Sequence, residues 1–168
     1  QALANRPEIA GIGSAELSLG AGQGLSNVKF AYQGQDKILF EYAVDQEYLR
    51  VLKMPLVSGR NFDPGIVSDS VTSVILNESA VREFGWTNET ALGQVLTGYN
   101  MQDPKRDPVV IGVSRDFHYR SLHEKVYPMM FNMFHDRLPW QFFVRLAPGD
   151  PRPALDHMKS AWAGVEPI

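Results

Sequence analysis

The chain has 168 residues and lacks cysteine, an excess of basic residues and any long hydrophobic run. Without cysteine it cannot form a disulfide, a thiolate metal site or a cysteine nucleophile. Its 16 Lys and Arg residues against 19 Asp and Glu residues give a net charge of −3, so nucleic-acid binding would lack its main electrostatic driving force. No segment approaches the roughly 18 apolar residues that a membrane-spanning helix requires. We therefore expect neither a disulfide scaffold nor a nucleic-acid partner.

The composition is typical of a folded globular domain, with 44% hydrophobic, 11% aromatic and 21% charged residues. A chain of this length can bury one core, or two small lobes that share one. The sequence begins at Gln1 and ends directly after an expected helix, so we expect it to be a segment of a longer protein.

Alternating apolar and polar residues predict strands in the first part of the chain. A strand is expected over 8–19, and residues 28–44 have the pattern of a hairpin. Asp45 can cap a helix over 46–53 that Pro55 would end. The patterns that follow predict a short extended piece, a loop and a strand, over 56–60, 63–70 and 71–76.

Short helices and strands alternate irregularly in the second half. Asn77 can cap a helix that Gly85 ends, and Asp150 can cap the final helix. Further strands are expected over 94–99, 109–113, 127–134 and 140–146. One apolar stripe of the final helix should face the core, and it consists of Leu155, Met158 and Trp162.

Because helices do not follow every strand, a doubly wound parallel sheet is not expected. The pattern instead predicts the α+β class, with mixed strands and short helices. We expect a porter-like lobe formed by residues 1–64 and 106–168 and a smaller inserted α/β lobe formed by residues 65–105.

No pattern in the sequence is that of an active site. The glycine loop 20–24 precedes a strand pattern rather than the helix that a phosphate site needs, so we interpret it as a plain loop. His123 and Glu124 begin the zinc-protease pattern, but its second histidine is missing. Asp116, His118 and His123 could in principle meet at a metal, although a hydrogen-bonded loop is the commoner arrangement. We therefore expect no catalytic residue, no metal and no cofactor.

The stretch 127–143 is rich in aromatic residues and methionine. Such a stretch could line a pocket for a hydrophobic ligand or peptide. More often it forms core strands. We expect a core role and keep the binding surface as the alternative.

Three stretches, taken together, resemble the MacB-type periplasmic core domain of bacterial ABC transporter permeases, in the FtsX-like permease superfamily. They are 44–62 (VDQEYLRVLKMPLVSGRNF), 74–94 (VILNESAVREFGWTNETALGQ) and 110–128 (VIGVSRDFHYRSLHEKVYP). Their order and spacing carry the resemblance, which extends over about residues 8–165.

The resemblance implies an extracytoplasmic, non-catalytic domain at the periplasmic or extracellular face of the bacterial inner membrane. The implied partners are the transmembrane helices of the permease, a cytoplasmic ATPase and an accessory periplasmic protein. The implied substrate is a peptide, a lipoprotein or a hydrophobic small molecule. The isolated domain should be monomeric or dimerise weakly, although the full transporter would be dimeric. The rival interpretations are a free-standing periplasmic ligand-binding or sensor module and, less favoured, a small hydrolase.

Structural or coupling roles, rather than catalysis, fall on residues of these three stretches. The candidates are Gly59, Arg60, Asn77, Glu78, Asp116, Phe117, His118 and Ser121. We expect Arg60 to pair with a carboxylate of the other lobe and Asp116 to accept backbone N–H bonds within its own turn. Phe117 should be a buried anchor, and Ser121 should cap a short turn to which Glu124 reaches back.

Overall fold

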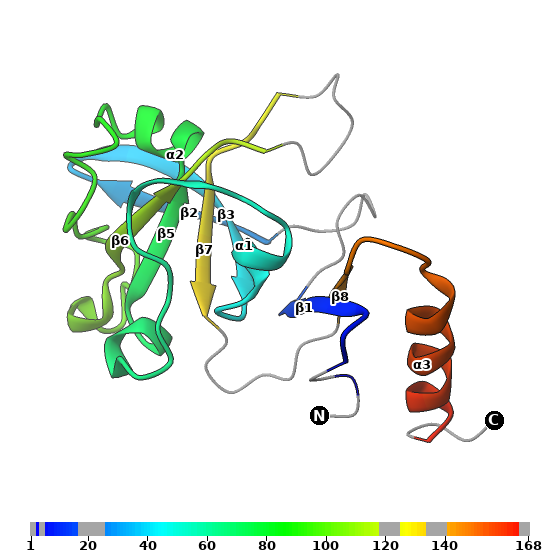
Figure 1. Ribbon diagram of the computed structural model, residues 1–168. Coiled ribbons are helices and arrows are strands. Elements are labelled where there is room, and N and C mark those ends of the chain that lie inside the picture. The colour runs from blue at the N-terminus through cyan, green and yellow to red at the C-terminus, as the bar shows by residue number, and fades with distance from the viewer. Residues whose placement is uncertain (1–2, 4–5, 17–25, 118–124, 134–140, 165–168) are drawn as a thin grey trace.

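The computed structural model describes residues 3, 6–16, 26–117, 125–133 and 141–164. The fold has many short strands and few helices, in agreement with the predicted α+β class (Figure 1). The strands are β1 (Ile9–Ala15), β2 (Ser26–Tyr32), β3 (Gln35–Val44), β4 (Leu56–Gly59), β5 (Ser73–Asn77), β6 (Val109–Ser114), β7 (Met129–Met133) and β8 (Gln141–Leu146). The helices are α1 (Tyr48–Val51), α2 (Glu78–Glu83) and α3 (Arg152–Ala163), with 3-10 turns η1 (Val67–Ser70) and η2 (Pro104–Arg106).

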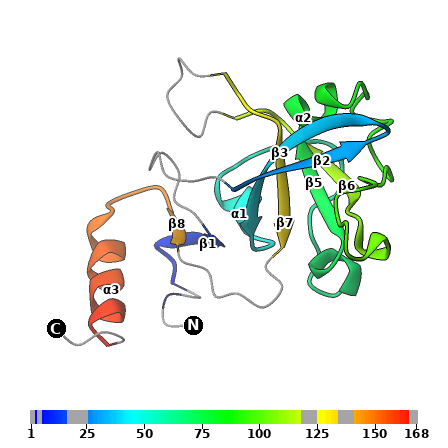
Figure 2. The same cartoon turned by 180° about the vertical axis from the view of Figure 1, so that it is seen from behind.

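These strands form one mixed sheet in the order β4-β6-β5-β7-β3-β1-β8, with β2 paired to β3. β5 runs parallel to β6 and β3 runs parallel to β7, whereas the other pairs are antiparallel. Among the described residues, β1 pairs with β3 at Ala15 and Val44. Figures 1 and 2 show α3 next to β1 and β8, on the side of the molecule away from α2. In the strand order, β5 is an interior strand between β6 and β7.

The period-2 alternation of the central strands directs side chains into two hydrophobic clusters on opposite faces of the sheet. On β5, Val74 and Leu76 belong to the cluster that α2 covers, and Ile75 belongs to the cluster that α1 covers. On β7, Met130 and Phe131 divide between the two clusters in the same way. The described part of β7 is thus core, as predicted for this part of the stretch 127–143.

The predicted strand over 94–99 is wrong, because these residues form turns with one isolated bridge between Val95 and Val109. Gly98 has a φ of 83°, and the amide of Tyr99 donates to the carbonyl oxygen of Leu96 at 3.1 Å. Leu96 itself is fully buried. The apolar pattern therefore reflected burial and not an extended backbone.

The predicted bounds of the first helix, the predicted loop 63–70 and the expected burial of the last helix need correction. α1 covers only Tyr48–Val51 instead of 46–53, and the predicted loop 63–70 contains the 3-10 turn η1. On α3, Leu155 and Trp162 are 44% and 62% exposed, so the predicted stripe does not face the core. A helical period identifies the apolar side of a helix but not what covers it.

The predicted hairpin over 28–44 is confirmed as β2 and β3, joined by two residues. Gln33 and Gly34 have φ values of 49° and 78°, and a two-residue turn of type I′ requires positive φ at both central positions. Gln33 is therefore held in a left-handed conformation that asparagine adopts more readily.

We predict that Gln33→Asn raises the free energy of unfolding by about 0.5 kcal/mol, since it relieves this conformational preference. Urea denaturation of the 168-residue chain measures the change. Gln35→Asn is the matched control, because Gln35 lies in the extended backbone of β3, where the same substitution brings no such gain. Equal effects of both substitutions would contradict the turn assignment.

Candidate functional site

The polar candidate residues that the structure describes lie in two networks, one at each end of β5. The Arg60 network comprises Arg60, Asp63, Asp69 and Ser73. The Asp116 network comprises Asn77, Glu78, Ser79, Arg82 and Asp116. Ser73 is the first residue of β5 and Asn77 is the last, so this strand connects the two networks directly.

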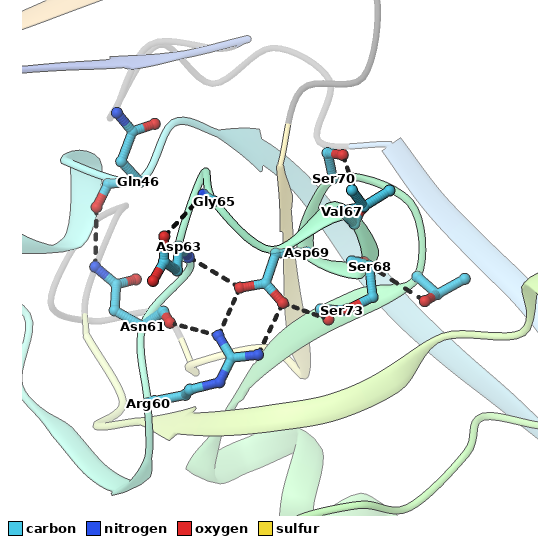
Figure 3. A network of polar contacts seen from close by, with 11 residues as sticks. Gln46, Arg60, Asn61, Asp63, Gly65, Val67, Ser68, Asp69, Ser70 and Ser73 are labelled. Atoms are coloured by element: carbon cyan, nitrogen blue, oxygen red, sulfur yellow. Dashed lines mark hydrogen bonds and ion pairs between the residues drawn. The ribbon is translucent and has the colours of Figure 1, made fainter.

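The Arg60 network is centred on the carboxylate of Asp69, which is 1% exposed. The guanidinium of Arg60 donates to both carboxylate oxygens, at 2.5 and 2.9 Å (Figure 3). The backbone amide of Asp63 and the hydroxyl of Ser73 donate to the same carboxylate at 2.9 and 2.8 Å. A bidentate, charge-assisted pair of this kind is directional as well as strong. It fixes the chain after β4, the turn η1 and the start of β5 to one another.

Gly59 explains how Arg60 reaches this position. Its φ is 73°, and a Cβ atom there would overlap the carbonyl oxygen of Ile111 on the neighbouring strand β6. The amide of Arg60 donates to that same carbonyl at 3.0 Å. The turn at Gly59 is therefore also a close approach of two backbones that only glycine permits.

Burial by itself would raise the pKa of Asp69, but the hydrogen bonds from Arg60, the Asp63 amide and Ser73 outweigh it and lower this pKa below its usual value. The hydrogen bond to Asp69 raises the pKa of Arg60. The pair is therefore ionised at neutral pH. It lies between a residue of the range 1–64 and a residue of the range 65–105, as the sequence interpretation expected, although the division into lobes remains a prediction.

Asn77 begins the second network. Its Oδ1 accepts from the amide of Ala80 at 2.9 Å, which confirms the predicted cap of α2, and also from the amide of Met129 at 2.9 Å. Its Nδ2 donates to the carbonyl oxygen of Tyr127 at 2.9 Å. One fully buried side chain therefore joins the end of β5, the start of α2 and the start of β7.

Asp116 lies just beyond β6 and binds the first turn of α2. Its carboxylate accepts from the amide and the hydroxyl of Ser79, both at 2.8 Å, and from the guanidinium of Arg82 at 2.6 Å. In return, the amide of Asp116 donates to Glu78 at 3.0 Å. Within the described residues, the side-chain partners of Asp116 are on α2, and the reciprocal arrangement resembles a capping box formed by two separate segments. The turn that follows Phe117 lies outside the described residues, so the expected backbone N–H bonds to Asp116 stay a prediction.

The remaining candidates are Phe117, His118 and Ser121. Phe117 is half-buried rather than buried, and its ring lies 6.0 Å from that of Phe131 with an interplanar angle of 29°. His118 and Ser121 lie outside the described residues, as does Glu124, so the predicted Ser121 cap stays a prediction.

Sequence reasoning missed Asp69, Ser79 and Arg82. Ser79 and Arg82 carry a weak signal, because residues three apart on a helix lie on the same side. Nothing in the sequence near Asp69 distinguishes it from Asp63. Within the described residues, no group of three His, Asp or Glu side chains could hold a metal ion. The groups of both networks satisfy one another, which is the arrangement of structural clamps.

The model of the MacB-like periplasmic core domain family matches residues 3–157. The periplasmic region of MacB from Actinobacillus actinomycetemcomitans is 17% identical, with a TM-score of 0.68 over 97% of this chain and 70% of that chain. The extracellular domain of the noncanonic ABC-type transporter YknZ from Gram-positive bacteria is 14% identical, with a TM-score of 0.60 over 90% of this chain and 73% of that chain. These likenesses show a shared fold. No curated protein matches the sequence.

Because the pKa of Asp69 is lowered, the free energy of unfolding should depend on pH in acid. Between the ordinary aspartate pKa of about 3.8 and the lower pKa of the folded state, the unfolded chain binds a proton that the folded chain does not. The stability due to Asp69 is therefore complete above pH 3.8 and is lost as the pH falls below it. Urea denaturation as a function of pH should show a shallower acid-side slope for Asp69→Asn than for the unchanged chain. Identical slopes would mean that Asp69 is not held ionised.

The triple contact of Asn77 predicts a large effect of its removal. Asn77→Ala should lower the free energy of unfolding by about 2–3 kcal/mol, because the cap is lost and the buried Met129 amide and Tyr127 carbonyl lose their partner. Asn77→Ser retains the cap and should cost about 1 kcal/mol less. Chemical denaturation of both variants measures the difference. If serine restored full stability, Asn77 would be only a helix cap.

Proposed function

This chain belongs to the family of MacB-like periplasmic core domains, and from that membership we propose that it relays ATP-driven conformational change in an ABC transporter permease. The resemblance found in the sequence is confirmed, and the chain is an extracytoplasmic transporter domain at the bacterial inner membrane. No helix in the part of the chain described is long and apolar enough to cross a bilayer. What we propose beyond family membership is the relay itself, the residues that perform it and the partners that it connects.

The observation that carries the proposal is the pair of networks at the two ends of β5. A segment that transmits displacement must be stiff and must be fixed at both ends. β5 is buried at all of its positions, Ser73 to Asn77, and each end is held by side-chain hydrogen bonds from other segments. Packed interiors of this kind shift as units instead of deforming gradually.

Under this proposal the displacement would enter the domain where β1 and α3 meet. The carboxylate of Glu8, just before β1, contacts the ring of His157 on α3, and the amide of Ala147 donates to the carbonyl oxygen of Glu8 at 2.9 Å. The start of β1 and α3 are therefore neighbours. Two permease helices that flank the domain could pull on this end together, and a cytoplasmic ATPase would drive them.

Under this proposal the domain catalyses nothing itself. The polar groups of both networks are engaged with one another, so they stabilise a conformation instead of activating a nucleophile. The transported substrate would be a peptide, a lipoprotein or a hydrophobic small molecule, with an accessory periplasmic protein as a further partner.

Asp116→Ala tests the relay in the intact transporter. It removes the carboxylate contacts of Asp116 with Ser79 and Arg82, so ATPase activity should stay within about twofold while movement of the domain is reduced. These 168 residues lack cysteine. In a transporter whose cysteines elsewhere are replaced, a spin label attached through Val67→Cys, a position 79% exposed, therefore reports the position of this domain alone. The label-to-label distance between two copies should change on ATP binding, and this change should be smaller in Asp116→Ala.

Asp36→Ala is the matched control, because it removes a carboxylate from the exposed ion pair with Lys29. It should leave the distance change as it is. An undiminished distance change in a folded Asp116→Ala transporter would contradict the relay, and the segment would then be only a stable connection.

A further inference from the structure

A pocket of about 250 Å³ lies between the end of α1 and the segment that follows β6. Its walls are Leu52, Lys53, Met54, Pro55, Arg115, Asp116 and Phe117. The side chains of Leu52, Met54 and Phe117 are partly buried against the cluster under α1, so they form an apolar floor. The exposed residues Lys53 and Arg115 contribute two cations.

Lys53 occupies a position that favours glycine. Its φ is 54°, its amide donates to the carbonyl of Arg50 at 3.1 Å, and the next amide, of Met54, donates to the carbonyl of Leu49 at 2.9 Å. These two bonds are the Schellman pattern that ends a helix, with lysine where glycine is usual. A strained non-glycine residue beside a pocket is a reason to look for a function of its side chain.

Arg115 is fixed next to Lys53 by the backbone. Its amide donates to the carbonyl oxygen of Pro55 at 2.9 Å, which continues the pairing of β4 with β6. Within the described residues, neither cation has a carboxylate partner. The acidic side chain that lines the pocket, Asp116, is already bound by Ser79 and Arg82. The unpaired charge of the pocket is therefore positive.

We propose that this pocket binds an acidic peptide segment of a partner protein, with one apolar side chain inserted on the floor and carboxylates paired to Lys53 and Arg115. Small-molecule sites usually have about 300–1,000 Å³, and this pocket is smaller, which suits a single anchoring side chain. The rest of the chain is net acidic, so attraction to an acidic segment must come from these two cations.

The choice of a protein over a lipid surface rests on the proposed function. In both ribbon views the segments after α1 and after β6 run along the upper side, whereas α3 ends on the lower side (Figures 1 and 2). Under the proposed function, with the membrane helices on the side of α3, the segments that line the pocket are on the side away from the bilayer. An accessory or neighbouring protein would reach it there.

The test uses the 168-residue chain and a fluorescent hexapeptide of alternating aspartate and phenylalanine, with binding followed by anisotropy. Affinity should fall about fivefold in Lys53→Gly and about fivefold in Arg115→Gln. It should also fall as the salt concentration rises from about 50 to about 300 mM. Lys53→Gly retains the helix end, so its midpoint of thermal unfolding should not decrease. Lys159→Gln on the exposed face of α3 is the control for loss of one positive charge and should bind as the unchanged chain does.

Equal binding of a hexapeptide with lysine in place of aspartate would overturn the proposal, as would unchanged affinity in both pocket variants. Binding of phosphatidylglycerol vesicles that Lys53→Gly abolishes, without peptide binding, would assign the pocket to a membrane surface instead. These measurements need neither ATP nor the permease. A failure here leaves the relay proposal intact, and a failure of the relay experiment leaves the peptide site intact.

Discussion

The burial of β5 is the constraint on which the rest of the structure depends. Each residue from Ser73 to Asn77 is buried, between one parallel and one antiparallel neighbour. A buried polar group without a partner costs about 1–3 kcal/mol, so the two polar ends of this strand need partners. Asp69 supplies one for Ser73, and Asp69 can stay charged there because Arg60 neutralises it. At the other end, Asn77 satisfies backbone groups of α2 and β7. Both networks follow from the position of one strand.

How much the sequence could predict depended on the range of the interactions. The β2–β3 hairpin and the Asn77 cap rest on neighbouring residues, and both were predicted. The partners of Asp116 are 34 and 37 residues away along the chain, so no local pattern could indicate them. At residues 94–99 a local pattern predicted a strand that does not form, because a buried Leu96 in a series of turns gives the same apolar pattern as a strand. The exposed stripe of α3 could not be foreseen, since helical periodicity says nothing about the surface opposite.

Asp116 belongs to both proposed functions, the relay and the peptide site. The backbone of Asp116 follows β6, its carboxylate holds α2, and it also lines the pocket beside Arg115. A peptide bound at that pocket would therefore lie next to the contacts that fix α2 to the segment after β6. The domain could in this way receive a partner and a mechanical displacement at adjacent residues, without a catalytic group. The Arg60 network then serves as the fixed point at the far end of the same strand.

Hydrogen exchange of individual amides tests most directly whether β5 joins the two networks. We predict that Arg60→Met, which breaks one network, accelerates exchange at Ala80 and Met129, whose amides donate to Asn77 at the other end. The comparison is with Val28→Ala in the β2–β3 hairpin, at urea concentrations that give both variants the same global stability. Exchange at Ala80 and Met129 that is faster in Arg60→Met than in Val28→Ala is the predicted result. Acceleration confined to residues 61–73 would contradict the account, because the two networks would then be independent.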